Sequence, residues 1–179
     1  MEQPPRDVAR EAVRASRNSP CRSKRGAVVF DDSGILSIGW NFRPGTPCDG
    51  SAACKALCRH TAVHAEQLAL LSLDAMRRRR PLEMLHVKTT VMQADPNDPL
   101  TAMGAIQAVP SGPPSCVQCS KLMLALSVRG MWLLHEDGWR RYPMDEFHAY
   151  SLANDPSLPI LGDGTFPAAD PSTGICANG

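Results

Sequence analysis

Two short stretches of this sequence carry side chains that can do chemistry together. In HTAVHAEQLALL, residues 60–71, His64 and Glu66 flank a single alanine at the start of an apolar helical run. Further along, GPPSCVQCSKLM places Cys116 and Cys119 in a C-x-x-C at the start of another expected helix. An ordinary core helix has no use for two ionisable groups so close together, which suggests that the two stretches form one site.

The set of His64, Cys116 and Cys119 is typical of a zinc site. The C-x-x-C spacing lets two thiolates converge on one cation, and a helix N-terminus stabilises their negative charge. Three protein ligands leave one position of a tetrahedral zinc open, which distinguishes a catalytic site from a structural one. From its place beside His64, Glu66 can reach that position, take a proton from a water that zinc has acidified, and so promote attack on an electrophilic carbon.

Each motif alone is weak evidence. A single C-x-x-C can also be redox-active, structural or accidental, and an H-x-E on a helix is more often an ordinary surface or core pair. The combination of H-x-E, a strand and P-x-C-x-x-C is far more specific. It follows the general signature of zinc nucleobase deaminases, from which we take the role of Glu66 as the proton carrier.

Composition limits the other possibilities. The 179 residues fit one domain, and a hydrophobic content of 43% favours a folded globule. A net charge of +1 gives no field for duplex nucleic acid, and no apolar run has the length of a membrane helix. The charged N-terminus lacks the apolar core of a signal peptide, so we expect a cytoplasmic protein. Seven cysteines, an odd number, then argue against a disulfide framework.

Hydrophobic periodicity predicts an alternation of helices and strands. We expect a hairpin over residues 26–40 and strands at 83–90 and 131–136. Proline and glycine mark a long loop at 41–59, an insertion or flap at about 92–114, and a flexible C-terminal tail at 155–179. The expected helices are 6–18, 61–77, 116–128 and 144–152.

This order predicts an α/β protein, a three-layer α/β/α sandwich with a mixed sheet. The hairpin supplies an antiparallel pair, and the later helical crossovers favour parallel neighbours. One domain over residues 1–154 would then carry the site, with the segment 155–179 following it.

The chain resembles the cytidine and deoxycytidylate deaminase superfamily, and within it the bacterial and phage deoxycytidylate (dCMP) deaminases. The resemblance spans residues 6–154 and is carried by SPCRSKRGAVVFDDSGILSIGWN, HAEQLALL and PSCVQCSKLMLALSVRGMWLL. It implies a cytidine deaminase-like fold and a zinc-dependent hydrolase that converts dCMP to dUMP with release of ammonia. The small-molecule nucleotide would be its substrate, and we expect a homo-oligomer.

The resemblance also implies substrate contacts. Asn41, at the end of the hairpin, would meet the nucleotide sugar, and Val63, Ala65 and Ser115 would line the base pocket. The loop before the hairpin offers four cations to a 5′-phosphate, with solvated surface charge as the alternative for each. We single out Arg22 and Lys24, while the choice among the four stays open: Arg17, Arg22, Lys24 and Arg25.

Two departures from the family pattern bear on specificity. Ser115 stands between the proline and the first cysteine of P-S-C-V-Q-C, which shifts the backbone carbonyl expected to accept a hydrogen bond from the exocyclic amine. The spacing between the two motifs is also longer than in the compact family pattern. The excess falls in residues 92–114, which could act as a lid or an oligomer contact.

A second group of cysteines suggests another metal. The loop PCDGSAACKALCRH contains a C-x-x-x-C-x-H, and a loop with so few apolar residues would gain order from a closed, structural zinc. Ordinary burial of small cysteine side chains is the alternative. The possible ligands are Cys21, Cys48, Cys54, Cys58 and His60.

Other functions compete with dCMP deamination. The substrate could be a 5-substituted dCMP, a nucleoside, a purine base or single-stranded nucleic acid. Aromatic residues make up only 5% and the net charge is near zero, which argues against a stacking channel for a polynucleotide. A non-catalytic zinc or nucleotide-binding module is the other class, and Glu66 counts against it because a structural site needs no proton carrier.

Overall fold

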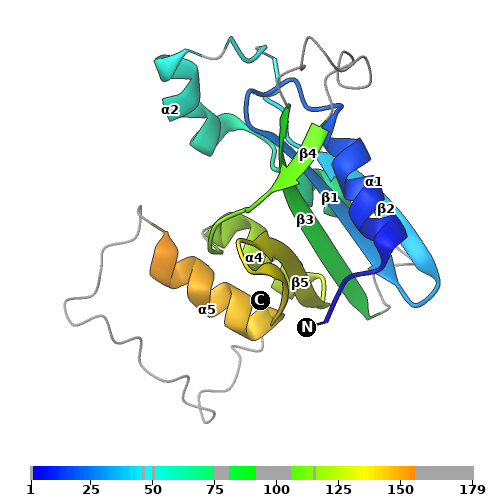
Figure 1. The fold of residues 1–179 in the computed structure, drawn as a ribbon. Coiled ribbons are helices and arrows are strands. Elements are labelled where there is room, and N and C mark those ends of the chain that lie inside the picture. The colour runs from blue at the N-terminus through cyan, green and yellow to red at the C-terminus, as the bar shows by residue number, and fades with distance from the viewer. Residues whose placement is uncertain are drawn as a thin grey trace, which may run out of the picture.

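A mixed sheet runs through the centre of the protein (Figure 1). The computed structural model describes residues 2–45, 47–49, 51–74, 81–91, 106–114 and 116–155. Its strands are β1 (Lys24–Asp31), β2 (Gly34–Trp40), β3 (Leu82–Val91), β4 (Ile106–Val109), β5 (Val128–His135) and β6 (Gly138–Pro143). Its helices are α1 (Arg6–Ser16), α2 (Ala52–Thr61), α3 (Ala65–Leu71), α4 (Val117–Ala125) and α5 (Met144–Asn154).

The strands lie in the order β2-β1-β3-β5-β6, and β4 pairs with β3 off this path. The β1–β2 hairpin is antiparallel, as expected, and β1 is also antiparallel to β3. The pairing of β3 with β5 is parallel, which the helical crossover through α4 requires. The sheet is therefore mixed, in agreement with the prediction.

Strand alternation divides the core into two clusters. Ala27, Val29 and Met84 face α3, α4 and α5 on one side of the sheet. Val28 and Leu85, the neighbours of these residues along the strands, face α1 on the other side. Helices cover both faces (Figure 1), so the predicted three-layer α/β/α architecture is confirmed.

Helix α3 lies unusually close to β2 because Gly39 has no side chain. A Cβ atom at Gly39 would collide with the backbone oxygen of Ala65 and the backbone nitrogen of Ala69. The hydroxyl of Ser37 on the same strand donates a hydrogen bond of 2.7 Å to the carbonyl of Ala69. Since Ala65 is the first residue of α3, this contact determines where the H-x-E motif stands relative to the sheet.

Two expectations about loops and helices were wrong. The segment 41–59 is not loop throughout, because α2 begins at Ala52. Its start is capped by the Ser51 hydroxyl, which accepts the Cys54 backbone N–H at 3.0 Å, a local signal that outweighs the lack of apolar periodicity. The helix expected over 61–77 begins only at Ala65, since the residue before His64, Val63, forms an extended bridge with Phe42.

Two strands were not predicted. β6 is polar and half-exposed, because it closes one edge of the sheet and has only Tyr142 fully inside. β4 lies within the segment assigned to the insertion and pairs with the end of β3. The remaining predicted helices and strands are confirmed with ends shifted by a few residues. Residues 75–77 of the expected helix, 92–105 of the insertion and 156–179 of the tail lie outside the described residues.

Within the described part of the chain, every helix is too short or too polar to cross a bilayer.

Replacing Gly39 with alanine should test whether the close contact between Gly39 and α3 fixes the position of this helix. Because the new methyl group meets helix backbone rather than a flexible side chain, Gly39→Ala should lower the free energy of unfolding by about 1–3 kcal/mol or more. Urea denaturation measures the difference. Ile35→Val, at an exposed position of the same strand, serves as the control and should change stability by less than about 0.5 kcal/mol. Equal stabilities would mean that α3 is not held by this contact.

Candidate functional site

Three side chains from two helix starts meet in a small triangle. His64 Nδ1 lies 3.2 Å from the sulfur of Cys116 and 3.2 Å from that of Cys119. The two sulfurs are 3.1 Å apart. Each residue thus offers one ligand atom to the same point, and together they could hold one metal ion.

Backbone hydrogen bonding explains why the triangle forms. His64 is the N-cap of α3, and its backbone N–H donates to the Gln67 side chain at 2.9 Å. Cys116 is the N-cap of α4, and its sulfur accepts the backbone N–H of Cys119 at 3.4 Å. The positive ends of two helix dipoles therefore point at the same group of ligands, which favours negative charge there.

The pKa shifts of the two thiols in the triangle also favour a bound cation. The hydrogen bond between the two thiols, with a further contribution from His64, lowers the pKa of Cys116 although burial opposes it. The same bond, followed by burial, raises the pKa of Cys119. The two thiols therefore titrate as a pair, in which Cys116 is the first to reach the thiolate state that a metal requires.

Glu66 lies beside the triangle but is not part of it. It is the second residue of α3 and only 9% exposed. Burial alone would raise the pKa of its carboxyl, but His86, His64 and Arg25 act in the opposite direction, and the net pKa shift is downward. Burial lowers the pKa of His86 itself to about 4. We assign the state at neutral pH as a Glu66 carboxylate beside a neutral imidazole.

His86 was not anticipated from the sequence. It lies in the middle of β3, is 3% exposed, and approaches Glu66 with its Nε2 atom 3.9 Å from Oε1. Alternation in LHVKTT was the available signal, since it places His86 and Lys88 on one face of a strand that is otherwise apolar. Nothing in that pattern says which helix the face meets, so the pairing with Glu66 required the structure.

Asn41 and Val63 were both expected to contact the substrate, and the structure shows what each of them contacts. Asn41 is buried, its Oδ1 accepts the Arg25 backbone N–H at 2.8 Å, and its Nδ2 donates to the Ser23 carbonyl at 2.9 Å. Val63 lies beside the triangle in its bridge with Phe42. The contact of Asn41 with a sugar and of Val63 with a base stay predictions.

The structure does not test the two other residues expected to line the base pocket, Ala65 and Ser115. Ala65 exposes no surface and packs in the core, and its contact with a base stays a prediction. Ser115 lies outside the described residues. The shift of the backbone carbonyl that we infer from Ser115 therefore stays a prediction.

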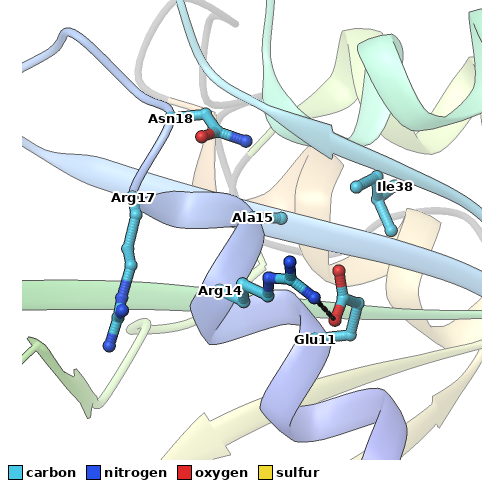
Figure 2. Close-up of a pocket in the computed structure, with 6 residues that line it drawn as sticks. All are labelled: Glu11, Arg14, Ala15, Arg17, Asn18 and Ile38. Atoms are coloured by element: carbon cyan, nitrogen blue, oxygen red, sulfur yellow. Dashed lines mark ion pairs between the residues drawn. The ribbon is translucent and has the colours of Figure 1, made fainter.

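The four cationic side chains that we considered for a 5′-phosphate contact lie in different surroundings. Arg22 is exposed, and the Lys24 ammonium already donates to the Ser19 carbonyl. Arg17 lines a pocket of about 330 Å³ between α1 and β2, where Arg14 is ion-paired with Glu11 at 3.7 Å (Figure 2). Because α1 packs on the opposite face of the sheet from α3 and α4, this pocket does not contain the triangle.

Of the four cations, Arg25 is the one whose charge acts on the site. It follows the alternation of Ala27 on β1 and so faces α3, and its charge affects the pKa of both His64 and Glu66. In the register of β1 and β3 it stands directly opposite Lys88. Two half-buried cations on one face of a strand pair repel each other, so the pair favours an anion between them.

A second group of thiols lies at α2. The Cys54 sulfur is 3.5 Å from that of Cys48 and 3.7 Å from that of Cys58, and the three could hold a metal ion. Burial raises the pKa of Cys21, and Cys48 and Cys54 add to the shift, which places Cys21 beside the same thiols. His60 lies in α2, but its side chain is outside the described part of the structure.

Solved structures with a similar fold are deaminases. The chain is similar to a cytidine deaminase from Burkholderia pseudomallei, at 17% identity over 81% of this chain and 96% of that chain, with a TM-score of 0.50. It also matches the dCMP deaminase from the cyanophage S-TIM5. The apo form matches at 22% identity over 70% and 77% of the two chains, with a TM-score of 0.43. The complex with dCMP and dUMP matches at 20% identity over 72% and 82%, with a TM-score of 0.42.

No family model matches the sequence, and no curated protein does. The likeness to the cytidine deaminase therefore establishes the fold, and it confirms the cytidine deaminase-like architecture implied by the resemblance. What the site does must be inferred from its own residues.

The thiols at α2 lead to a prediction about metal content. We expect about two zinc ions per chain in the purified protein and about one in Cys54→Ser, because a cluster of thiols that folds around zinc loses it with a central ligand. Elemental analysis after gel filtration measures this, and the thermal midpoint should fall with the zinc. Cys176→Ser, which changes a cysteine of neither group, is the matched control. Unchanged zinc content in Cys54→Ser would eliminate the second metal.

Proposed function

We propose that the protein is a zinc-dependent hydrolase that deaminates a pyrimidine nucleotide, most specifically dCMP to dUMP with release of ammonia. The observation that carries this proposal is the buried Glu66 carboxylate beside the triangle of His64, Cys116 and Cys119 and not part of it. A structural metal site has no need of such a group.

The donor set fits zinc. Two sulfurs and one imidazole nitrogen suit a borderline-soft cation and not magnesium or calcium, which take oxygen ligands. When bound, zinc polarises a water molecule and lowers its pKa towards neutrality. His64, Cys116 and Cys119 would hold the ion from one side, and the fourth position would remain open for chemistry.

Glu66 would move the protons. Its carboxylate is held in a largely water-free position at the start of α3, where it can accept the proton of the attacking water. It can then pass this proton to the ring nitrogen of the base. When the added hydroxyl becomes a carbonyl, the carboxylate can take up its remaining proton and deliver it to the amine, which departs as ammonia. The nearby charge of Arg25 favours the ionised carboxylate that begins this sequence.

The cations on β1 and β3 support a nucleotide over a nucleoside. Arg25 and Lys88 face the same side of the sheet as Glu66, and an anion between them would relieve their repulsion. A 5′-phosphate supplies such an anion, and charge-assisted hydrogen bonds to it would fix the distance between the sugar and the reacting base. Arg22 and Lys24, singled out from the sequence, remain alternatives on the preceding loop.

A polynucleotide substrate is less well supported. Among the described residues, Tyr150 is 42% exposed and packs edge-to-face on Tyr142, while Trp40, Phe42 and Trp139 are half-buried. Single-strand binders use rows of exposed aromatic platforms. The scarcity of exposed aromatic side chains among the described residues therefore supports a small substrate.

The role of Glu66 can be separated from metal binding. Glu66→Gln keeps the shape of the side chain but cannot accept a proton, so turnover of dCMP should fall by about 10²–10⁴-fold or more. Zinc content should stay at the wild-type value, because the three ligands are intact. Cys116→Ala is the contrasting variant and should lose one zinc ion per chain together with the activity. Ammonia release and elemental analysis measure the two quantities.

The wild-type protein should first be tested on dCMP, 5-methyl-dCMP, deoxycytidine, cytidine and single-stranded DNA. Activity on none of them would refute the proposed function. If Glu66→Gln kept more than about a tenth of wild-type turnover, the assignment of Glu66 as general acid and base would be wrong.

The phosphate contact can be tested by comparing nucleotide with nucleoside. Arg25→Met or Lys88→Met should reduce kcat/KM for dCMP by about tenfold or more, since a lost charge-assisted contact costs roughly 1.5–3 kcal/mol. The kcat/KM for deoxycytidine should change little. Arg129→Met, at an exposed position of β5 that we assign no role, is the matched control. Equal losses on both substrates in the first two variants would remove Arg25 and Lys88 from phosphate recognition.

A further inference from the structure

His86 has an unexplained polar atom in the core. Its side chain lies between the sheet and α3, and only 3% of the residue is exposed. The Nε2 atom is fully buried and has no hydrogen-bond partner among the described residues. Glu66 Oε1 lies 3.9 Å from it. A buried polar group without a partner is unfavourable, so a role for this imidazole is expected.

The other side of the ring is held by Ser111. The serine hydroxyl lies 3.4 Å from His86 Nδ1, and the backbone N–H of Ser111 donates to the Leu134 carbonyl on β5 at 2.8 Å. The serine is thus anchored to the sheet independently of its hydroxyl. Ser111 lies two residues beyond the end of β4, so the last part of the 92–114 segment supplies this contact.

The hydrogen-bonding roles of Glu66 and Ser111 determine which ring nitrogen of His86 carries the proton. Burial holds the pKa of His86 at about 4, so the ring is neutral at physiological pH and carries one proton. The carboxylate of Glu66 can only accept a hydrogen bond, which requires the proton on Nε2. Nδ1 is then an acceptor, and the Ser111 hydroxyl is its donor. Ser111, His86 and Glu66 form a chain in which each group has one consistent role.

We propose that His86 is a positioning residue that directs its Nε2–H at the Glu66 carboxylate and fixes its orientation towards the substrate, while Ser111 holds the imidazole in the required tautomer. The inference rests on the proposed deaminase function, since it gives Glu66 its task. Closing the gap from 3.9 Å to a hydrogen bond takes a movement of about 1 Å. Catalytic hydrogen bonds are often this long before substrate binds and shorten in the complex.

The hydrogen bond has a specific consequence for catalysis. Among the described residues, no side chain yet donates a hydrogen bond to the Glu66 carboxylate, which is restrained by packing and by its own backbone N–H. His86 is therefore the side chain placed to fix its orientation. A carboxylate that transfers protons at more than one step must return to the same orientation each time. Loss of the imidazole donor should therefore reduce kcat, whereas KM for substrate and the zinc content should change little.

Three variants test this on the zinc-loaded protein. His86→Leu removes the donor and should lower kcat by about 10–100-fold, the usual effect of losing a group that orients a catalytic side chain. His86→Gln keeps an N–H donor close to the position of Nε2 and should restore most of that loss. Val87→Ala, also fully buried on β3 but facing α1, should lower stability and leave kcat unchanged.

A double variant separates positioning from general structural damage. In a Glu66→Gln background, His86→Leu should cause less than about a twofold further loss, because the two residues act through the same step. A full additional loss would overturn the proposal, as would wild-type kcat in His86→Leu. If His86→Leu fails to fold, Ser111→Ala decides, with an expected reduction of kcat and no change in zinc content.

A spectroscopic readout does not depend on turnover. Nitrogen-15 NMR of labelled histidine should show the proton of His86 on Nε2, a mixture of tautomers in Ser111→Ala, and a shifted Nε2 signal in Glu66→Gln. A proton on Nδ1 in the wild type would overturn the inference. If the wild-type protein deaminates no substrate, the proposed function fails, while these shifts still show whether His86 and Glu66 are hydrogen-bonded.

Discussion

The structure depends on the convergence of two helix N-termini at one point above the sheet. Helix α3 brings His64 and Glu66, and α4 brings Cys116 and Cys119, so neither helix alone can bind a metal or do chemistry. Their positive dipole ends favour the thiolate and carboxylate charges that this point collects. Everything that fixes the two helices on the sheet therefore also fixes the site, including the backbone contact of Gly39 with α3 and the burial of Met123 on α4.

Burying this many polar groups is unfavourable unless each one has a compensating partner. Asn41 uses both ends of its amide on the backbone at the start of β1. Ser120, fully buried on α4, contacts His148 on α5 at 2.9 Å and so joins the two helices behind the triangle. The Nε2 atom of His86 has no hydrogen-bond partner among the described residues, and an uncompensated polar atom in a core is typical of groups retained for function.

The sequence predicts what depends on short-range patterns. The H-x-E and C-x-x-C motifs, the turn of the hairpin and the apolar period of α1 are all local, and each was identified correctly as a structural feature. It does not predict features that depend on which strand lies beside which. β6 has a polar sequence and is a strand because β5 offers it an edge, and the meeting of His86 with Glu66 follows from the register of β3 beneath α3.

The long spacing between the two motifs is compatible with the site because of β4. The antiparallel register of β3 and β4 pairs Val91 with Ile106, so the two ends of the intervening segment are held about one strand spacing apart. The entropy of closing such a segment rises only slowly with its length, and extra residues there need not displace the cysteines. Beyond the pairing, the chain returns along β3 past Lys88 and delivers Ser111 to His86 before it reaches Cys116. The segment that separates the motifs thus ends by contributing a residue to the support of Glu66, which links the unusual length of this part of the chain to the organisation of the site.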